Sequence, residues 1–498
     1  MRPDTKGSQP TVLERISTMR RTLASLVMAG AVTLVGCNLD LTNPNNPTLA
    51  GCLTNPRECT SRMIAGVMAT YRSNRTDQIR ALGSFGRETY YMFITDGRFI
   101  TGPYRDWKQN NAFDAGTQWA GRYGNYRNAY AAMQIINSTT ALTDSEKAGG
   151  IGVLKTFIAL DLLHVIEARD SIGGVVDMTN DVNAVLPIVS RDSVYAWISA
   201  KLDEARPEID SAGAAFYFPI YTGFSVGVPA NANTPAGFAQ FNRAIKARVE
   251  AKRGSLGCGA TCYNAALTAL GQTWVADLTA ANRDNGVYTV YSSSSGDFLN
   301  NASFAGSLGS DLYVHPGIDS IASVALDDRY RRKISLCPAN SPRSEAGVTA
   351  SHRPCTYAGI STPIPIIRNE ELVLLRAEAE WFTGATATAT TDLAAVRANS
   401  GGSNGGTSVV AFPAPASDSQ FVSELLLQRT LSLYQEGQRW ADYRRLKRLA
   451  ELGRLPQDTL ARFTVAPFSV LPNQECDSRK RAGNPGGVPL SCPGNPVP

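Results

Sequence analysis

Residues 223–227 match a nucleophilic-serine motif. Residues 223–227, Gly-Phe-Ser-Val-Gly, fit the pattern G-x-S-x-G, in which a serine is exposed on a sharp turn between a strand and a helix. The surroundings fit poorly, because Pro219 interrupts the preceding segment and residues 228–231, Val-Pro-Ala-Asn, do not begin a helix. We therefore interpret the motif as part of a loop, and a hydrolase that uses Ser225 stays an alternative hypothesis.

A second candidate for chemistry is the thiol of Cys37. Two arginines precede a short apolar run, Thr22 to Val35, which ends at Gly36-Cys37. The run is shorter than the ~20 residues of a membrane-spanning helix, and it has the layout of a secretory signal. A cysteine directly after small residues resembles a bacterial lipobox, in which the thiol is acylated. We predict that residues 1–36 are leader and signal peptide, with Met19 as the true start, and that Cys37 carries the lipid.

The remaining cysteines fall into close pairs. Nine cysteines are present in all, and an exported chain meets an oxidising compartment, where local disulfides form. Each bond would close a short loop and add about 2–3 kcal/mol to the free energy of unfolding. The predicted disulfides are Cys52–Cys59, Cys258–Cys262, Cys337–Cys355 and Cys476–Cys492.

Other chemistry has little support in the sequence. The histidines are His164, His315 and His352, and only His352 lies near a cysteine pair, so we predict no metal site and no cofactor. Acidic pairs occur on predicted helix or turn surface, and nothing marks them as a catalytic pair. The net charge of +5 is spread along the chain, without the basic stripe that nucleic-acid binding requires.

The segments that must position these residues are mostly helical. An Asn- and Pro-rich tether follows Cys37, and helical spacing of apolar residues begins near Arg62. Thr143 opens a capping box with Glu146, and Thr234 precedes a proline at a helix start. We expect Asn369 and Ser417 to cap two later helices. This pattern predicts a mostly α fold of helical hairpins.

The segment from Gln428 to Arg445 resembles the closing motif of the SusD/RagB family of outer-membrane nutrient-binding lipoproteins. Gln428 and Ser432 stand where the family usually has glutamates. The segments 367–379 and 242–248 are similar to two further helices of that family. The residues that fit the closing motif are Arg429, Glu436, Gly437, Arg439, Trp440, Asp442 and Arg445.

The resemblance implies a tetratricopeptide-like scaffold with a loop-rich variable part that carries the ligand site. It also implies a surface or outer-membrane lipoprotein that binds a glycan or another nutrient and delivers it to a TonB-dependent barrel of the SusC type, without catalysis. We expect residues 37–60 to be the lipidated tether and 61–498 a single SusD-like domain. The motif itself is predicted to be structural, with Glu436–Arg439 and Asp442–Arg445 paired at helical spacing and Trp440 in the core.

The ligand site is predicted to lie in long loops rich in Gly, Ser, Asn and Tyr, because function concentrates on loops that a rigid scaffold carries. An aromatic face offers a sugar a rigid contact surface. The competing interpretation is that the rings only pack the loops onto the helices, and a helical-repeat scaffolding lipoprotein is the remaining alternative function. The candidate ligand contacts are Tyr104, Trp107, Tyr288 and Tyr313.

The lipid anchor is directly testable. We expect Cys37→Ser to move the protein from the membrane fraction to the soluble fraction, or to leave it unprocessed, because serine cannot form the thioether. Fractionation followed by mass spectrometry of the N-terminal peptide measures both outcomes. Normal membrane retention of the processed variant would contradict the prediction, and Cys52→Ser, a second cysteine near the N-terminus, serves as the control.

Overall fold

The computed structural model describes residues 52, 54–107, 116–181, 183–321, 327–338, 342–402, 414–453 and 465–495. The chain divides into two units, Met1–Asn55 and Pro56–Pro498, and all elements described below belong to the second. Cys37 and the signal segment lie outside the described residues. The first described helix already begins at Pro56, inside the segment predicted to be tether.

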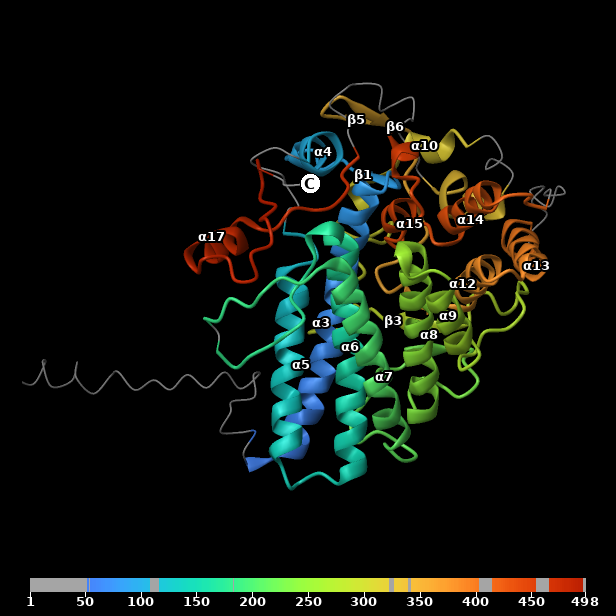
Figure 1. Cartoon of the computed structure of the whole chain (residues 1–498). Coiled ribbons are helices and arrows are strands. Elements are labelled where there is room, and N and C mark those ends of the chain that lie inside the picture. Colours follow the sequence, from blue (N-terminus) through green and yellow to red (C-terminus); the bar gives the residue numbers. More distant parts are fainter. Residues whose placement is uncertain are drawn as a thin grey trace, which may run out of the picture. The chain divides into compact units, whose positions relative to one another are not determined.

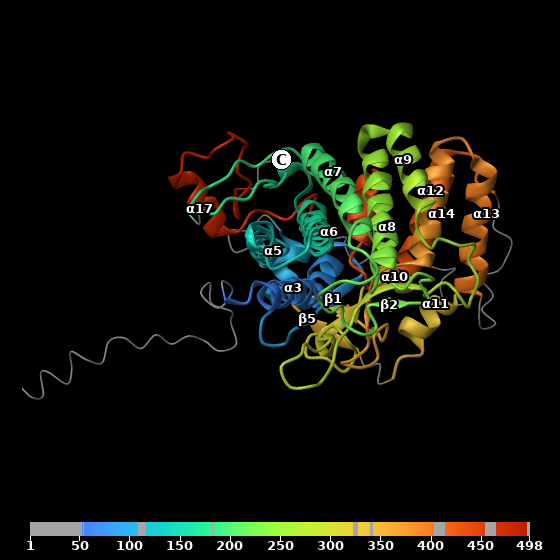
Figure 2. The same cartoon turned by 90° about the horizontal axis from the view of Figure 1, so that it is seen from below.

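A series of antiparallel helices forms the scaffold, and each helix packs against the next along the chain (Figures 1 and 2). The chain is mostly helical, as predicted. The helices in order are α3 (Pro56–Phe85), α5 (Ala120–Ser138), α6 (Asp144–Arg169), α7 (Arg191–Asp210), α8 (Pro235–Arg253), α9 (Ala260–Leu270), α12 (Asn369–Phe382), α13 (Thr386–Val396), α14 (Asp418–Ser432) and α15 (Arg439–Arg445).

Helix α6 is the centre of this scaffold. Within the described part of the chain, the segment Asp144–Ile172 is the one long and apolar enough to cross a membrane, yet 89% of its window is buried inside the protein. A glycine allows its close packing, because a Cβ on Gly152 would lie 2.7 Å from Ile209 and 3.0 Å from the Ala205 carbonyl. The apolar character of α6 therefore reflects burial among α3, α5, α7 and α8.

The helix starts mostly follow the sequence signals. Thr143 and Glu146 form the predicted capping box, and Thr234 and Ser417 accept backbone hydrogen bonds as caps. The expected cap at Asn369 is wrong. Asn369 is the first residue inside α12. Its side-chain oxygen accepts from the Ala276 amide at 3.0 Å, and its side-chain nitrogen donates to the Ala276 carbonyl at 3.0 Å.

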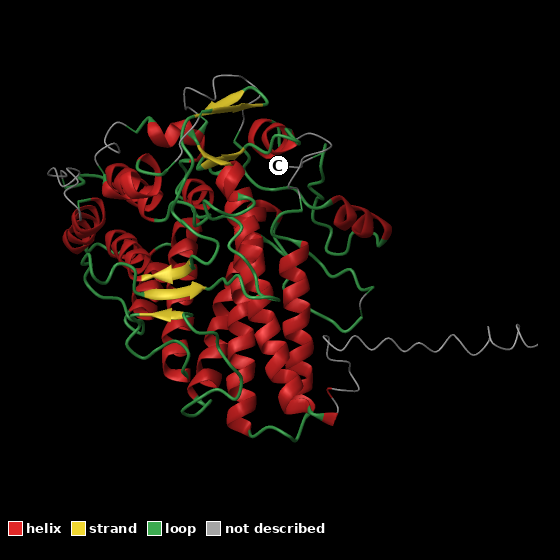
Figure 3. Cartoon of the chain, turned by 180° about the vertical axis from the view of Figure 1, so that it is seen from behind, coloured by secondary structure: helices red, strands yellow, loops and turns green. Residues whose placement is uncertain are grey.

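Short strands run through the long loops, and apart from one local hairpin they pair across large separations in sequence. In the three-stranded antiparallel sheet the order is β2-β3-β7, and the sheet is visible from behind in Figure 3. The other sheets are the pairs β1-β4 and β5-β6. The strands are β1 (Thr89–Tyr91), β2 (Ser225–Val226), β3 (Gly286–Thr289), β4 (Leu312–Val314), β5 (Arg343–Glu345), β6 (Val348–Ala350) and β7 (Ile364–Arg368).

Short helical segments complete the described elements. They are α4 (Arg98–Ile100), η1 (Thr101–Arg105), η2 (Asp170–Ile172), η3 (Gly254–Cys258), η4 (Gly309–Asp311), α10 (Pro316–Asp319), α11 (Asp328–Tyr330), η5 (Arg331–Ser335), η6 (Arg397–Gly401), α16 (Leu449–Leu452) and α17 (Asn473–Arg481).

Disulfides fasten several of these short elements. Cys258 bonds Cys262 at the start of α9, Cys337 bonds Cys355 between loop segments, and Cys476 on α17 bonds Cys492. These are the pairs that their spacing predicts. Cys59 is disulfide-bonded as well.

The segment from Arg429 to Arg445 packs inward as a buried cluster of charges. Arg429 lies 2.7 Å from Asp442, and Asp442 lies 2.9 Å from Arg445, which confirms the second predicted pair. Arg445 continues to Glu378 on α12 at 2.8 Å. These side chains are all buried, so the cluster joins α12, α14 and α15 in the interior.

The other predicted pair, Glu436 with Arg439, is wrong. Glu436 lies before α15, which begins only at Arg439, and Gly437 between them has a φ of 75°. Helical spacing therefore does not apply to the pair. Glu436 binds Arg368 at 2.9 Å instead, and Arg439 donates to the carbonyls of Gly86 and Arg87 at the end of α3.

Ser432 takes a linking role in place of a glutamate. Its hydroxyl donates to Glu370 at 2.6 Å and accepts from Arg329 at 2.9 Å. Arg329 also forms a two-pronged contact with Asp327. A hydroxyl thus connects two charged groups without adding a further charge to the interior.

Trp440 is predicted to act through stability. Its ring is 1% exposed and stacks on Phe85 at 4.6 Å, and its Nε1 donates to the Ala466 carbonyl at 2.7 Å. Trp440→Ala should lower the free energy of unfolding by about 3–5 kcal/mol, because it leaves a large cavity. Denaturant unfolding measures the change, with the partly exposed Trp197→Ala as a control expected to lose less. An unchanged midpoint for Trp440→Ala would overturn its core assignment.

Candidate functional site

A cavity of about 380 Å³ lies over the three-stranded sheet and is the candidate site. It combines aromatic, basic, acidic and proline side chains from four separate stretches of sequence. Its lining residues are Val226, Asp284, Tyr288, Arg332, Lys333, Thr356, Tyr357, Thr362, Pro363, Pro365, Arg368 and Glu436.

The sheet carries two of these residues, Val226 on β2 and Tyr288 on β3. Val287 of β3 and Ile367 of β7 are paired in register and belong to the main hydrophobic core. The pairing is irregular between Val287 and Tyr288, and Tyr288 is half-buried and lines the cavity, while Val226 on β2 is 47% exposed. The sheet thus buries one face on the scaffold and presents the other to the cavity.

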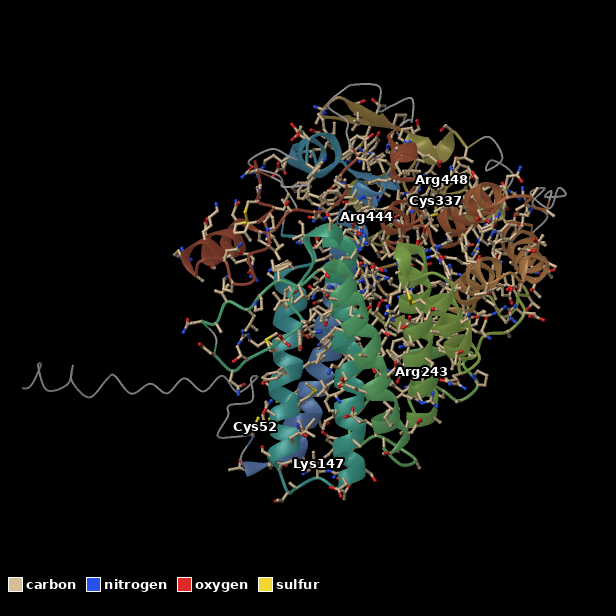
Figure 4. All side chains as sticks on the ribbon, viewed as in Figure 1. Cys52, Lys147, Arg243, Cys337, Arg444 and Arg448 are labelled. Carbon is tan, nitrogen blue, oxygen red and sulfur yellow. A yellow bond between two sulfur atoms is a disulfide. The ribbon has the colours of Figure 1, made fainter. Side chains whose placement is uncertain are left out.

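A disulfide holds the opposite wall. Cys337–Cys355, with Cys337 labelled in Figure 4, joins the end of η5 to the segment before Thr356 and Tyr357. The Cys355 amide donates to the Lys333 carbonyl at 2.8 Å. The Tyr357 hydroxyl donates to the Gln435 carbonyl at 3.1 Å. Residues on both sides of the disulfide are therefore fixed relative to the closing motif.

The acids of the cavity are both in contact with Arg368. This guanidinium contacts Glu370, lies 2.9 Å from Glu436 and 3.3 Å from Asp284. Burial raises the pKa of Glu436, although the charge of Arg368 acts in the opposite direction. The second carboxylate oxygen of Glu436 is buried and accepts no hydrogen bond among the described residues.

Lys333 acts as a helix cap. Its ammonium group donates to the carbonyls of Leu431 and Ser432, at 2.9 and 2.7 Å, where α14 ends. A cation at a helix C-terminus is favoured by the helix dipole. Burial, together with the charges of Arg368 and Arg332, lowers the pKa of Lys333 to about 7.

The predicted aromatic ligand contacts do not gather at one site. Tyr104 and Tyr313 are 0% and 2% exposed and share a small core with Tyr90. The Tyr104 hydroxyl lies 2.9 Å from a ring nitrogen of His315. Trp107 packs edge-on against Phe468, in the main core. These rings lie in the interior, so for them the structure favours the competing packing interpretation.

Tyr288 is the exception among those candidates. Its side chain is half-buried and lines the cavity, and its hydroxyl donates to the Asp284 carbonyl. The hydroxyl is therefore anchored, and the ring is available as a contact surface.

Sequence reasoning missed the basic residues of this cavity. Arg332 and Lys333 follow Arg331 in a short basic run, which was a visible signal next to the Asp327–Asp328 pair. Thr356 and Tyr357 gave no signal of their own, and Glu436 was assigned only a structural role. Their common location arises from the disulfide, which the cysteine spacing predicts, and from strand pairing between distant segments, which the local sequence does not encode.

Ser225 does not sit in a nucleophile elbow. It lies in strand β2, its hydroxyl accepts from the Ala232 amide at 3.0 Å, and the next helix begins only at Pro235. The described residues also contain no group of three or more His, Cys, Asp or Glu side chains that could hold a metal ion.

A larger cavity, of about 750 Å³, lies between the start of α5, the loop near residues 175–186, and α17. Its buried cation Arg479 is already engaged, because it lies 2.7 Å from Glu475 and donates to the Leu186 carbonyl at 2.8 Å. The sheet cavity is taken as the candidate because it holds Tyr288 together with Arg332, whose Nε is buried without a hydrogen-bond partner among the described residues.

Comparison with known proteins points to one family. Residues 345–463 match the model of the SusD family. No curated protein sequence matches the chain significantly.

Solved structures of that family share the fold over most of the chain. B. fragilis NanU is 16% identical with a TM-score of 0.59, over 87% of this chain and 96% of its own. A SusD superfamily protein from Bacteroides vulgatus is 14% identical with a TM-score of 0.60, covering 87% and 99%. A SusD/RagB family protein from Bacteroides thetaiotaomicron is 14% identical with a TM-score of 0.59, covering 86% and 96%.

A buried acid that interacts with this charged cluster gives a pH prediction. Glu88 is 1% exposed, and neither carboxylate oxygen has a hydrogen-bond partner among the described residues. Burial raises the pKa of Glu88 from an ordinary 4.5 to about 8. The charge of Arg439 acts to lower this pKa, and the charge of Glu436 acts to raise it. The folded protein therefore keeps this proton at pH values where the unfolded chain releases it, and stability is lost as the pH rises from 4.5 toward 8.

Glu88→Gln, which stays neutral, should remove this loss. Relative to the variant, the wild type should lose up to about 1.4 kcal/mol of unfolding free energy per pH unit in that window. Urea unfolding at a series of pH values measures the difference, with the exposed Glu58→Gln as the control. A difference between wild type and Glu88→Gln that does not vary with pH would show that Glu88 is not buried in its protonated form.

Proposed function

The chain is a SusD/RagB family protein, and we propose that it binds a nutrient in the sheet cavity and delivers it to a SusC-type transporter. SusD family proteins bind nutrients together with SusC transporters. The ligand proposed here is a glycan or another oligomer, and the proposed partner is a TonB-dependent outer-membrane barrel.

The observation that carries the proposal is the setting of Tyr288. A half-buried ring with an anchored hydroxyl loses little freedom when a ligand packs on it. Polar groups able to orient hydroxyls surround it in the same cavity, including Thr356 and Thr362. An aromatic face with few convergent polar groups is the usual composition of a small-molecule site.

The proposed location is the outer membrane, with the lipid on Cys37 and the protein exposed at the cell surface. This part rests on the signal segment and on family membership. A tether between the lipid and the folded unit would let the cavity reach soluble nutrient while the protein remains beside a transporter.

The alternative functions have weaker support. An exported hydrolase would need a nucleophile on a strained turn, and Ser225 lies in a strand with its hydroxyl engaged. A purely scaffolding lipoprotein would not need an aromatic cavity with charged walls. Binding without catalysis is the function that this geometry supports best.

Tyr288→Ala tests the proposed site. A glycan array with the purified protein first identifies a binding oligosaccharide, and calorimetry then measures its affinity. We expect the variant to bind about 10- to 30-fold more weakly, as for a central contact residue, with an unchanged melting temperature. Tyr130→Ala on scaffold helix α5 is the matched control and should keep full affinity. Full affinity in Tyr288→Ala would place the glycan site elsewhere.

A further inference from the structure

Arg332 differs from the other cations of the sheet cavity because no residue in the described part of the chain pairs with its guanidinium. No hydrogen bond or ion pair joins its guanidinium to another described residue, and its Nε is buried without an acceptor. Burial lowers the pKa of Arg332, and the charge of Arg283 adds to this effect. The side chain is thus half-buried, charged and unsatisfied.

The charged side chains around Arg332, in contrast, all have partners. Arg331 lies 3.2 Å from Asp328, Arg368 binds three carboxylates, and Lys333 caps α14 through two carbonyls. The acids closest to the cavity, Asp284 and Glu436, are both held by Arg368. Among the described residues, Arg332 is therefore the cation of the lining whose donors no carboxylate or carbonyl engages.

A desolvated charge without a partner is costly, and folded proteins usually pair it. The planar guanidinium fork matches the oxygens of a carboxylate or a sulfate, and such charge-assisted hydrogen bonds are about twice as strong as neutral ones. An anion entering the cavity would satisfy the Arg332 donors that the protein leaves open. A neutral ligand would leave the charge unbalanced.

We propose that the sheet cavity selects ligands that carry an anionic group, a carboxylate or a sulfate ester, and that Arg332 binds that group while the ring of Tyr288 contacts the adjoining apolar face. The selection of an anionic ligand builds on the proposed nutrient-binding function. Arg332 sets the preference for acidic over neutral ligands, and Tyr288 contributes to both.

The disulfide wall supports this arrangement. The carbonyl of Arg332 lies 3.5 Å from the sulfur of Cys355, and the carbonyl of Lys333 lies 3.2 Å from the sulfur of Cys337. The backbone that carries Arg332 is thus fastened to the segment that carries Thr356 and Tyr357. The backbone position of Arg332 is thus fixed before the ligand arrives, which reduces part of the ordering cost of binding.

Arg332→Gln tests the proposal with paired probes. Purified full-length protein in detergent is titrated by calorimetry with tetragalacturonate and its carboxyl-reduced neutral counterpart. A sulfated galactose tetrasaccharide and its desulfated counterpart form the second pair. Acetate and sulfate are tested as free ions by thermal shift at constant ionic strength. The matched control is Arg331→Gln, which removes the same charge from the adjacent, partly exposed position paired with Asp328.

The expected result is that at least one acidic probe binds the wild type at least tenfold more tightly than its neutral counterpart. Arg332→Gln should weaken that binding by about 10- to 100-fold, as for a hydrogen bond to a charged group, and Arg331→Gln should not. The pair that responds distinguishes a carboxylate from a sulfate ligand. A stabilising effect of acetate or sulfate that disappears in Arg332→Gln alone also supports the proposal.

The opposite results overturn it. If no acidic probe exceeds its neutral counterpart, and neither free ion stabilises the wild type more than Arg332→Gln, then Arg332 does not select an anion. Neutral oligosaccharides that still require Tyr288 would leave the proposed nutrient site intact in that case. Anion binding that needs Arg332 but is unchanged in Tyr288→Ala would instead remove the aromatic contribution and keep the anion site.

Discussion

The structure depends on pairing the buried carboxylates of α12. Glu371 bonds Arg248 of α8 at 2.7 Å through both its oxygens, Glu378 bonds Arg445 of α15, and Glu370 contacts Arg368 at the end of β7. Burial by itself would raise the pKa of Glu371, but the charge and hydrogen bonds of Arg248 outweigh it and the pKa is lowered. Removing one partner of such a pair leaves an uncompensated charge and costs about 3–5 kcal/mol. The pairs therefore act as constraints on register.

This constraint links the scaffold to the candidate site. α12 packs among α8, α9, α13 and α14. Glu370 in its first turn pairs with Arg368, and the Arg368 guanidinium also pairs with Glu436 in the cavity wall. Helix α12 therefore packs within the scaffold and also fixes the position of the cavity wall. The inward-facing charges of the closing motif stabilise this junction and leave the ligand contacts to residues of the sheet and loops.

Some residues of the cavity have structural partners, and others are open to a ligand. Pairing with Arg368 offsets the acids, and a helix end satisfies Lys333, so Arg332 retains an open set of donors. Tyr288 supplies a flat contact surface from the exposed face of a strand whose other face is core. Different residues of the cavity therefore serve stability and ligand binding. Arg368 and Glu436 maintain the fold, whereas Tyr288 and Arg332 are left for the ligand.

The sequence alone determined the features that depend on local chemistry. Helix periodicity, the caps at Thr143, Thr234 and Ser417, the close cysteine pairs and the family resemblance all involve residues near one another in the chain, where spacing fixes geometry. The burial of Trp440 was also predictable from the sequence, because a ring of this size in a helical segment favours the core.

Only the tertiary structure decided which distant residues meet. Helical spacing paired Glu436 with Arg439, but a turn at Gly437 separates them and Arg368 takes the carboxylate. Tyr104, Tyr288 and Tyr313 were equivalent as loop aromatics, and strand pairing buried Tyr313 while leaving Tyr288 at a cavity. The role of Arg332 depends on a missing partner, and an unpaired charge is visible only when every neighbour in space is known.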